Sequence, residues 1–415
     1  MNLDPYKGVR DFYPEDQRVQ NRIFSAMRRA VEAYGYEEMN ASILEPTELY
    51  AKKSSEEIVS EQTYTFTDRG DRSVTLRPEM TPTVARMVAA RKRELGYPLR
   101  WYSIQNFFRY ERPQRGRLRE FWQLNADLFG SDRIEADVET VAVAHRIMME
   151  LGATDSDFTI HMSDRGFLGD AALTYGVDAQ NIPALVRLVD KKDKMEEAVF
   201  IDTLSGLFPK GNARDFAASM NEALQHIPAS VAERIKLLGE LGVNNVSFDP
   251  YLARGFDYYT GMVFEVFDTD TRNTRSMFGG GRYDNLVGHY ANESVPAVGF
   301  AMGDVIARDF LETHKLLTDV LPTTHLYIAP ISESNTVDAM KVADTLRQEG
   351  VRVSVGVIPK KIGDHIKAAL KLGIPYFVAF GDAEKESGLL TVKTLADSSE
   401  EALTVNALSE YVRKE

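Results

Sequence analysis

The segment FFRYERPQRGRLREFWQLNADLFG, residues 107–130, decides the fold of the first part of the chain. Two runs rich in aromatic residues, RWYSIQNFFRYER (100–112) and REFWQLNADLFG (119–130), flank the loop PQRGRL (113–118). Proline and glycine between two such runs are typical of a β-hairpin. We therefore expect two long antiparallel strands joined by a charged loop.

Polar residues alternate along this predicted hairpin. Alternation puts Arg109 and Glu111 on one face of the first strand, and Gln123, Asn125 and Asp127 on one face of the second. Guanidinium groups pair with phosphate oxygens bidentately, which favours a polyphosphate site over a solvated charged hairpin. The loop arginines are also suited to a nucleic-acid backbone. Five arginines lie within residues 109–119: Arg109, Arg112, Arg115, Arg117 and Arg119.

Composition restricts the classes of protein that the chain can represent. Its 415 residues are 44% hydrophobic and 27% charged, which indicates two or three globular domains. No run approaches about 18 apolar residues, so we expect no membrane span. Absence of cysteine excludes disulfides and thiolate metal sites. The net charge of −13 argues against non-specific coating of nucleic acid, but it does not exclude binding of one structured RNA.

The pattern along the chain divides it into domains. Residues 1–134 and 241–321 contain most of the predicted strands, whereas residues 135–240 are mainly helical in pattern. We therefore expect one sheet-based core, assembled from the two outer segments and interrupted by a helical insertion. Beyond a linker at Pro322, residues 322–415 alternate strands and helices, which predicts a small α/β domain with a largely parallel sheet.

Three further motifs contain candidate binding residues. The run LRPEMTPT (76–83) suits either a capped helix start or a site for an ammonium group. In LARGFDYYTGMVFEVF (252–267), Gly255 would allow close approach of the backbone to a ligand beside Arg254. The glycines of FGGGRYDNLVG (278–288) destabilise a regular element unless they serve a turn or a ligand. None of the seven histidines has metal-ligand spacing, and no P-loop motif is present.

These motifs together resemble the histidyl-tRNA synthetases, which are class II aminoacyl-tRNA synthetases, over essentially the whole chain. FRYERPQRGRLREFWQ (108–123) is similar to class II motif 2. ARGFDYYTG (253–261) and GGGRYD (279–284) resemble the two peptides peculiar to the histidine enzymes. The segment from the helix at 17–35 through Pro46 resembles motif 1. The resemblance implies a catalytic domain on an antiparallel sheet, a helical insertion and a C-terminal anticodon-binding domain.

The resemblance also implies a reaction and its residues. Histidine attacks the α-phosphate of ATP, and the adenylate is transferred to the 3′ end of tRNA(His), with ATP and Mg²⁺ as cofactors. Arg109 would hold the α-phosphate, Glu111 would read the adenine amino group, and Arg117 would meet the outer phosphates. Arg254 would lie between the histidine carboxylate and the α-phosphate, so Arg109 and Arg254 are the expected catalytic residues.

Histidine recognition is implied in the same way. Glu79, Thr81 and Gln123 would hold the backbone groups of the amino acid, while Asp127 and Tyr259 would contact the imidazole nitrogens. The implied histidine-binding set is Glu79, Thr81, Gln123, Asp127, Arg254, Tyr258 and Tyr259.

The remaining implications concern partners and location. Arg112 and Gln114 in the motif 2 loop would face the extra 5′ guanosine of tRNA(His). Motif 1 implies a homodimer. The N-terminal run MNLDPYKGVRDFYPED (1–16) lacks the regions of a secretory signal, so we expect a cytoplasmic protein without membrane partners.

The sequence departs from the class II pattern in AVGFAMGDVIARDFLE (297–312). Ile306 occupies the position of the motif 3 arginine that holds the γ-phosphate, and an isoleucine cannot pair with phosphate. We expect Arg117 or Arg282 to bind ATP in its place. Asp127 is a second departure, because members of this family often carry glutamate there.

Two non-catalytic alternatives remain. The altered motif 3 favours a paralogue such as the regulatory subunit of ATP phosphoribosyltransferase. Against it stand the C-terminal domain, which that subunit typically lacks, and the intact ARGFDYYTG and motif 2 loop. A synthetase-like sensor of uncharged tRNA is the other alternative, but 415 residues leave no room for an output domain.

Overall fold

The computed structural model describes residues 3–51, 62–192, 195–209, 212–254, 258–273, 275–317 and 322–413. Its internal contacts divide the chain into two units, Met1–Leu317 and Thr318–Glu415, which are described separately below. Among the helices within the described ranges, none is both long and apolar enough to cross a lipid bilayer.

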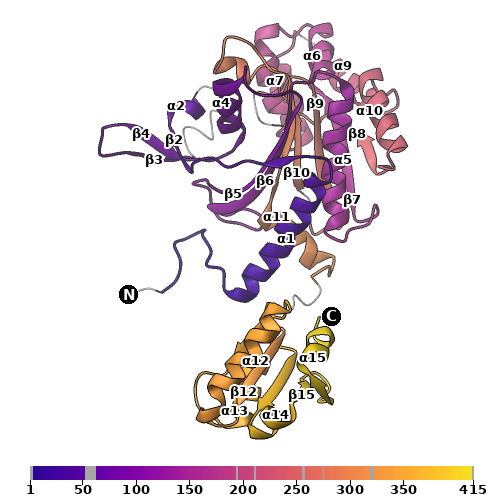
Figure 1. Ribbon diagram of the computed structural model, residues 1–415. Helices are drawn as coiled ribbons and strands as arrows, with labels where there is room; N and C mark the ends of the chain where they lie inside the picture. Colours follow the sequence, from indigo (N-terminus) through magenta and orange to yellow (C-terminus); the bar gives the residue numbers. More distant parts are fainter. Residues whose placement is uncertain are drawn as a thin grey trace. The chain divides into compact units, whose positions relative to one another are not determined.

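An eight-stranded sheet forms the centre of the first unit (Figure 1). Pairing from β5 through β6, β11, β10 and β9 to β7 is antiparallel, whereas β1 and β8 pair in parallel at the two edges. The expected sheet is confirmed, with parallel edges that the sequence did not predict. In spatial order the strands are β1 (Glu37–Glu38), β5 (Leu99–Phe108), β6 (Glu120–Phe129), β11 (Ala297–Gly303), β10 (Ser276–Arg282), β9 (Met262–Asp268), β7 (Phe158–Asp164) and β8 (Val246–Phe248).

Three helices cover one face of this sheet: α1 (Pro14–Glu32), α5 (Ile134–Glu150) and α11 (Asp304–Thr313). A proline in the first turn of α1 and the acidic residues beside it suit a helix N-terminus. Apolar side chains from the three helices pack against the even-numbered residues of β6, namely Leu124, Ala126 and Leu128. The odd-numbered residues of β6 therefore face the opposite side of the sheet.

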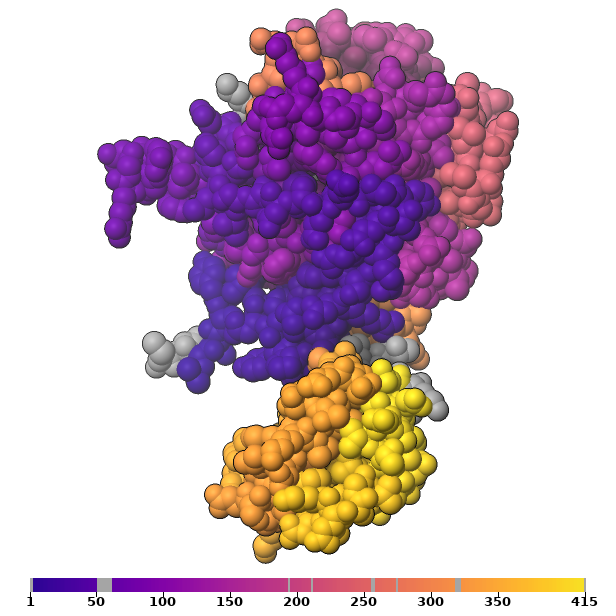
Figure 2. Space-filling view, viewed as in Figure 1, coloured from indigo at the N-terminus to yellow at the C-terminus, as the bar shows by residue number. Residues whose placement is uncertain are grey.

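The opposite face is only partly covered. Helix α4 (Thr81–Arg91) packs there through Val84, Ala85 and Val88. A small sheet of β2 (Leu44–Pro46), β4 (Ser73–Leu76) and β3 (Tyr64–Thr67) adjoins it, together with α2 (Glu48–Ala51). The β3–β4 hairpin projects from the body of this unit (Figures 1 and 2).

Residues 135–240 do not form the one separate helical insertion that the sequence pattern predicts. Part of this range belongs to the central sheet and its core. Strand β7 lies within the central sheet, and α5 and α10 (Ala229–Glu240) pack in the main core. A separate core is built by the helices between them, and we call these four helices the helical block. The block comprises α6 (Arg165–Thr174), α7 (Ile182–Val189), α8 (Glu197–Ser205) and α9 (Asn212–Ala223).

The local pattern explains this difference. In β7, Phe158, Ile160 and Met162 alternate with polar residues and enter the main core. A seven-residue strand between long helices is easily missed, because a short apolar run does not by itself distinguish a strand from a helix.

The second unit is an α/β sandwich around a five-stranded sheet of order β13-β12-β14-β15-β16. Only the β12–β13 and β12–β14 pairs are parallel, so the expectation of a largely parallel sheet was wrong for its second half. A tight reversal after β15 forms a hairpin instead of a crossover. The elements are β12 (Leu326–Pro330), α12 (Thr336–Gln348), β13 (Val353–Val355), α13 (Ile362–Lys371), β14 (Tyr376–Phe380), α14 (Asp382–Ser387), β15 (Leu389–Thr394), β16 (Glu400–Thr404) and α15 (Val405–Tyr411).

Candidate active site

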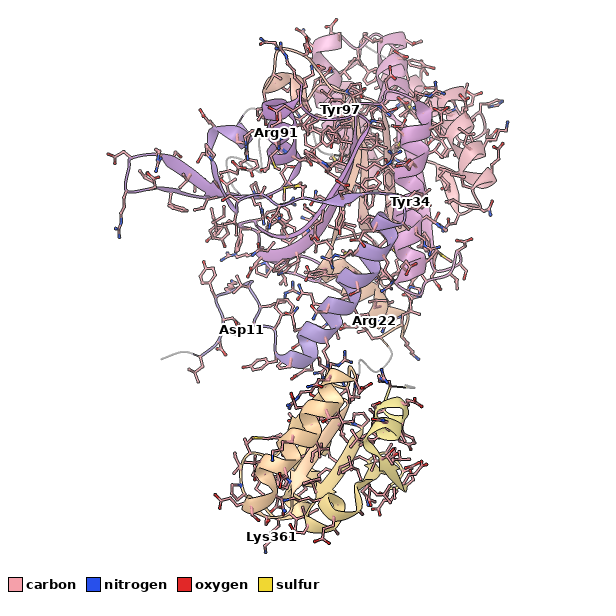
Figure 3. The ribbon with its side chains drawn as sticks, in the orientation of Figure 1. Asp11, Arg22, Tyr34, Arg91, Tyr97 and Lys361 are labelled. Atoms are coloured by element: carbon pink, nitrogen blue, oxygen red, sulfur yellow. The ribbon has the colours of Figure 1, made fainter. Side chains whose placement is uncertain are left out.

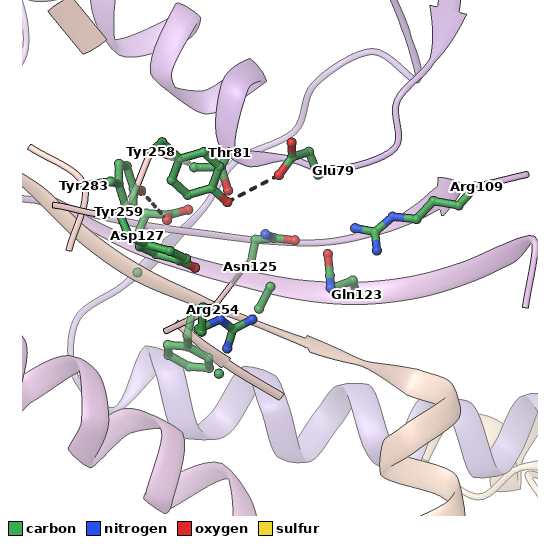
Figure 4. Close-up of a pocket in the computed structure, with 14 residues that line it drawn as sticks. Glu79, Thr81, Arg109, Gln123, Asn125, Asp127, Arg254, Tyr258, Tyr259 and Tyr283 are labelled. Atoms are coloured by element: carbon green, nitrogen blue, oxygen red, sulfur yellow. Dashed lines mark hydrogen bonds between the residues drawn. The ribbon is translucent and has the colours of Figure 1, made fainter. Parts of the chain in front are cut away.

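A pocket of about 120 Å³ lies on the open face of the eight-stranded sheet (Figure 4). Arg109 lies toward one end, and Asp127 lies at the other among three tyrosines, with Gln123 and Asn125 between them on β6 (Figure 4). The lining residues are Glu79, Thr81, Arg109, Gln123, Asn125, Asp127, Arg254, Tyr258, Tyr259, Gly279, Tyr283, Gly299, Phe300 and Ala301.

Strand alternation assembles this lining from neighbouring strands. On β6 the residues in the pocket are Gln123, Asn125 and Asp127, as the sequence pattern predicts. On β11 they include Gly299, which is paired with Asp127 across the ladder. On β10, Gly279 lies on the same face. The chain therefore presents its polar side chains and its smallest residues to one side of the sheet.

Glycine makes room for two of the polar side chains. A β-carbon on Gly279 would lie 2.1 Å from Nη1 of Arg254, and one on Gly299 would lie 2.0 Å from Oδ1 of Asp127. Both distances are far below van der Waals contact, so these positions admit no side chain unless the neighbours move. The glycine-rich run 279–281 is thus a strand that accommodates pocket residues, and it is not a turn.

Asp127 is a buried carboxyl group of the pocket with a raised pKa. It is 3% exposed, and burial raises its pKa to about 7, although a hydrogen bond from Tyr283 opposes this shift. The Tyr283 hydroxyl donates to Oδ1 at 2.5 Å, and burial keeps the pKa of Tyr283 well above its ordinary value. Oδ2 has no hydrogen-bond partner among the described residues. A ligand N–H group is the partner that a buried carboxylate oxygen needs.

Glu79 and Thr81 lie where β4 leads into α4, with Thr81 as the first residue of the helix. Glu79 is 3% exposed, and the Tyr258 hydroxyl donates to its Oε2 at 3.3 Å (Figure 4). The motif starts a helix, as one interpretation of LRPEMTPT predicts, with a proline in the first turn but no side-chain cap hydrogen bond. A carboxylate and a hydroxyl at this place can bind an ammonium group.

Arg109 forms the other end of the pocket. Its Nε donates to the carbonyl of Pro78 at 2.9 Å, and its Nη1 lies 4.0 Å from Oε1 of Glu111. Nη1 of Arg117 lies 3.5 Å from Oε2 of the same glutamate. Glu111 and Arg117 therefore adjoin the pocket through Arg109 without lining it. Two guanidinium groups around one carboxylate make this end suited to an anionic ligand.

The loop beyond Arg109 is a tight turn. Backbone hydrogen bonds run in both directions between Gln114 and Arg117. Arg112 and Gln114 are exposed and lie outside the pocket lining. The structure therefore leaves these two side chains accessible to a macromolecule.

Arg254 enters the pocket from the segment that precedes the undescribed residues 255–257, among which Gly255 lies. Its Nη1 donates to the carbonyl of Phe264 at 3.3 Å and lies 3.6 Å from Oε1 of Glu265. The backbone φ of 48° is uncommon for a residue other than glycine. Such a conformation persists only where surrounding contacts hold it.

Arg282 does not serve the pocket, which corrects its assignment as an ATP-binding residue. Its Nε donates to Oδ1 of Asp137 at 2.8 Å, and its Nη1 donates to the carbonyl of Ser131 at 2.9 Å and to Oδ1 of Asp284 at 3.1 Å. Residues 280 and 282 point toward the helices, whereas 279, 281 and 283 point toward the pocket. Besides Gly279, the pocket residue of this motif is Tyr283, which the sequence pattern did not predict.

Ile306 lies beneath the motif 2 loop. A β-carbon on Gly116 would come within 3.1 Å of its Cδ1, and Ile306 packs against the main core. Its place in the fold is therefore apolar, as its side chain requires. Of the two proposed replacements for a motif 3 arginine, only Arg117 remains beside the pocket.

Comparison with known proteins identifies the family of the chain. The family profile described as histidyl-tRNA synthetase matches residues 8–304, and that described as anticodon binding domain matches residues 325–415. The chain is 37% identical to a histidine–tRNA ligase of Leptospira biflexa, an alignment that covers 100% of this chain and 98% of the relative. It is also 37% identical to a histidine–tRNA ligase of Halobacterium salinarum, an alignment that covers 97% of this chain and 96% of the relative.

A solved structure shows the same fold. The crystal structure of histidyl-tRNA synthetase from Nostoc sp. PCC 7120 matches with a TM-score of 0.83 at 22% identity, and the match covers 100% of this chain and 99% of that one. The central sheet and the C-terminal α/β unit thus have their counterparts in one class II architecture. By fold and by full-length sequence similarity, the chain belongs to the histidyl-tRNA synthetase family.

Proposed function

We propose that this protein activates histidine with ATP and charges tRNA(His). In the first step a carboxylate oxygen of histidine bonds to the α-phosphorus while the bond to the bridging oxygen breaks, and pyrophosphate leaves. In the second step the histidyl group passes to the 3′ end of the tRNA and AMP leaves. Two unlike substrates must therefore be held end to end.

The polarity of the pocket is the observation that supports this proposal. One end carries the guanidinium of Arg109, and the other end carries the buried carboxyl of Asp127, whose Oδ2 lacks a partner among the residues described. Phosphate suits the first end and an imidazole N–H suits the second. Arg254 lies along the pocket wall, where its fixed charge can stabilise negative charge that develops at phosphorus.

Recognition of the amino acid follows from the same arrangement. Glu79 and Thr81 would bind the ammonium group, with Gln123 beside them. Tyr258 and Tyr259 are buried and keep their hydroxyl protons, because burial raises the pKa of each tyrosine. A substrate without a ring N–H group would leave Oδ2 of Asp127 unpaired among the described residues, which penalises its binding strongly.

We expect histidine alone to support ATP–pyrophosphate exchange. The measurement uses the purified full-length protein without tRNA, with each of the twenty amino acids tested singly. Exchange with histidine, and none above background with the other nineteen, supports adenylation. Histidine binding without exchange would instead favour a regulatory paralogue, which the altered motif 3 makes the second candidate.

Arg117→Ala is expected to raise the KM for ATP about tenfold, the effect of losing one hydrogen bond to a charged group. The KM for histidine should stay unchanged, because Arg117 lies at the Arg109 end. Arg308→Ala is the matched control, because Arg308 is already paired with Asp16 and Glu312. An unchanged KM for ATP in Arg117→Ala would show that this loop arginine does not replace the motif 3 arginine.

Binding of tRNA(His) is assigned to both units. Arg112 and Gln114 are exposed beside the pocket and are proposed to contact the acceptor end. In the second unit, Lys360 and Lys361 are exposed, and Lys361 lies at the edge of that unit (Figure 3). Exposed lysines on a unit that matches the anticodon binding domain profile are suited to contact a tRNA backbone.

The other parts of the proposal are Mg²⁺, a homodimer and a cytoplasmic location. Within the described ranges, no three His, Asp or Glu side chains converge on a common point. Mg²⁺ would therefore be held mainly by ATP phosphates and water, as is usual for this ion. For the homodimer, the exposed side chains of Leu44 and Phe66 on the small sheet offer an apolar surface.

A further inference from the structure

Arg165 is the first residue of the helical block, at the point where the chain leaves β7 and begins α6. It does not line the pocket. Its guanidinium nevertheless donates to three backbone carbonyls of the segments on either side of residues 255–257. Nε binds Ala253 at 3.1 Å, Nη2 binds Arg254 at 2.6 Å, and Nη1 binds Tyr259 at 3.0 Å.

The same residue anchors the chain further along. The backbone N–H of Arg165 donates to the carbonyl of Gly261 at 3.1 Å. Ala253 is 1% exposed and is buried within the core of the helical block. The Tyr251 hydroxyl donates to the carbonyl of Ala217 on α9 at 3.1 Å. The loop segment that carries Arg254 is therefore fixed to the helical block as well as to the sheet.

Arg165 also influences the side chains that reach the pocket. Its guanidinium carbon lies 5.8 Å from the ring centre of Tyr259, and that of Arg254 lies 5.9 Å from the same ring centre. Arg165 thus holds the carbonyl of Arg254, whose φ of 48° requires support, and contacts the ring of the tyrosine beside it. A lysine cannot reproduce this, because one ammonium group does not present donors in the planar fork of arginine.

We propose that Arg165 is a positioning residue for histidine activation, which holds Arg254 and Tyr259 in the pocket through their backbone carbonyls. This inference rests on the proposed function. Because Arg165 belongs to the helical block, it also means that the block supports the site where histidine and the α-phosphate meet. Arg109 and Arg117 lie on another element, so the ATP end does not depend on it directly.

The test is histidine-dependent ATP–pyrophosphate exchange by full-length Arg165→Met and Arg165→Lys, with histidine and ATP varied in turn. A displacement of about 1 Å in a reacting group costs about 100-fold, so kcat/KM for histidine should fall about 100-fold in Arg165→Met. The KM for ATP should change by less than about threefold. Arg165→Lys should recover part of the loss. Arg214→Met, an exposed arginine of α9 in the same block, should behave as wild type.

A purely structural role predicts a different pattern. A KM for ATP that rises as much as the KM for histidine, together with a lowered Tm, would overturn the inference, and so would a histidine kcat/KM within about threefold of wild type. If Arg165→Met does not fold, Arg165→Lys decides: a lowered kcat/KM for histidine with an unchanged KM for ATP supports the proposal, and an unchanged kcat/KM or an equal rise in both KM values contradicts it. Wild-type protein without histidine-dependent exchange would overturn the proposed function itself, so the two failures are distinguishable.

Discussion

Replacement of Arg254 by methionine is expected to lower kcat for histidine-dependent ATP–pyrophosphate exchange about 1000-fold. Loss of one preorganised donor to a transition-state charge costs about 100- to 1000-fold, and Arg254 carries a full charge in a partly buried position. Its guanidinium fits a space that Gly279 leaves open and is held by Phe264 and Glu265. Few alternative positions are therefore open to it.

The kinetic pattern separates this role from a loss of folding. We expect the KM for ATP to change little, because Arg109 and Arg117 still hold the phosphates. Arg254→Lys should remain far below wild type, since one ammonium cannot reach both the substrate and the Phe264 carbonyl. Arg146→Met is the control, because Arg146 forms an exposed i,i+4 pair with Glu150, a kind worth about 0.3–0.5 kcal/mol. Activity of Arg254→Met within about tenfold of wild type would remove Arg254 from the catalytic machinery.

The same contacts show which parts of the site could be predicted from the sequence. Gln123 and Asp127 were placed on one face because β6 keeps a strict period of two, and the hairpin loop fixes its limits. In β10 the sequence does not show which residues face the pocket. Three consecutive glycines carry no polar or apolar alternation. Only the pairing of β10 with β9 and β11 shows that Arg282 faces the helices and that Tyr283 faces the pocket.

Long-range pairing explains the other differences. Strand β7 lies between two helical stretches in sequence, yet it pairs with β9, about a hundred residues later. No local pattern contains that information, so α5, β7 and α10 were grouped with the helical block. Arg165 was overlooked for a related reason. Its partners are the carbonyl groups of Ala253, Arg254 and Tyr259, and a sequence motif describes side chains, not the backbone groups to which a distant arginine donates.

Asp127→Asn is expected to abolish histidine recognition and to stabilise the protein at the same time. The substitution keeps the shape of the side chain, so the Tyr283 hydroxyl can still donate to Oδ1. The amide would place an N–H where Oδ2 now lacks a partner among the described residues, and this N–H would oppose an imidazole N–H. We expect kcat/KM for histidine to fall about 10⁴-fold, the scale for unpaired buried polar groups.

The stability effect follows from the pKa of Asp127, which burial raises from 3.8 to about 7. Below pH 4 the carboxyl is protonated in both the folded and the unfolded state. As the pH rises from 4 to 7, only the unfolded state loses the proton, so the free energy of unfolding falls through this window and then stays low. Asparagine does not ionise, so the free energy of unfolding of Asp127→Asn should not fall in this window. Relative to wild type, the variant should therefore become more stable as the pH rises, by at most about 4 kcal/mol at pH 8.

Two measurements test this pair of effects. Tm measured from pH 4 to 8 should show the difference between Asp127→Asn and wild type growing until about pH 7. In exchange assays, wild-type kcat/KM for histidine should rise through about pH 7 as Asp127 ionises, and the variant should lack that rise. Asp127→Glu restores a carboxylate and should keep measurable activity, although Gly299 leaves little space beside it. A stable Asp127→Asn that still activates histidine would mean that the imidazole binds elsewhere.

A variant destabilised at pH 8 would mean that the folded protein stabilises the charged form of the Asp127 carboxylate. The raised pKa of Asp127 would then be wrong.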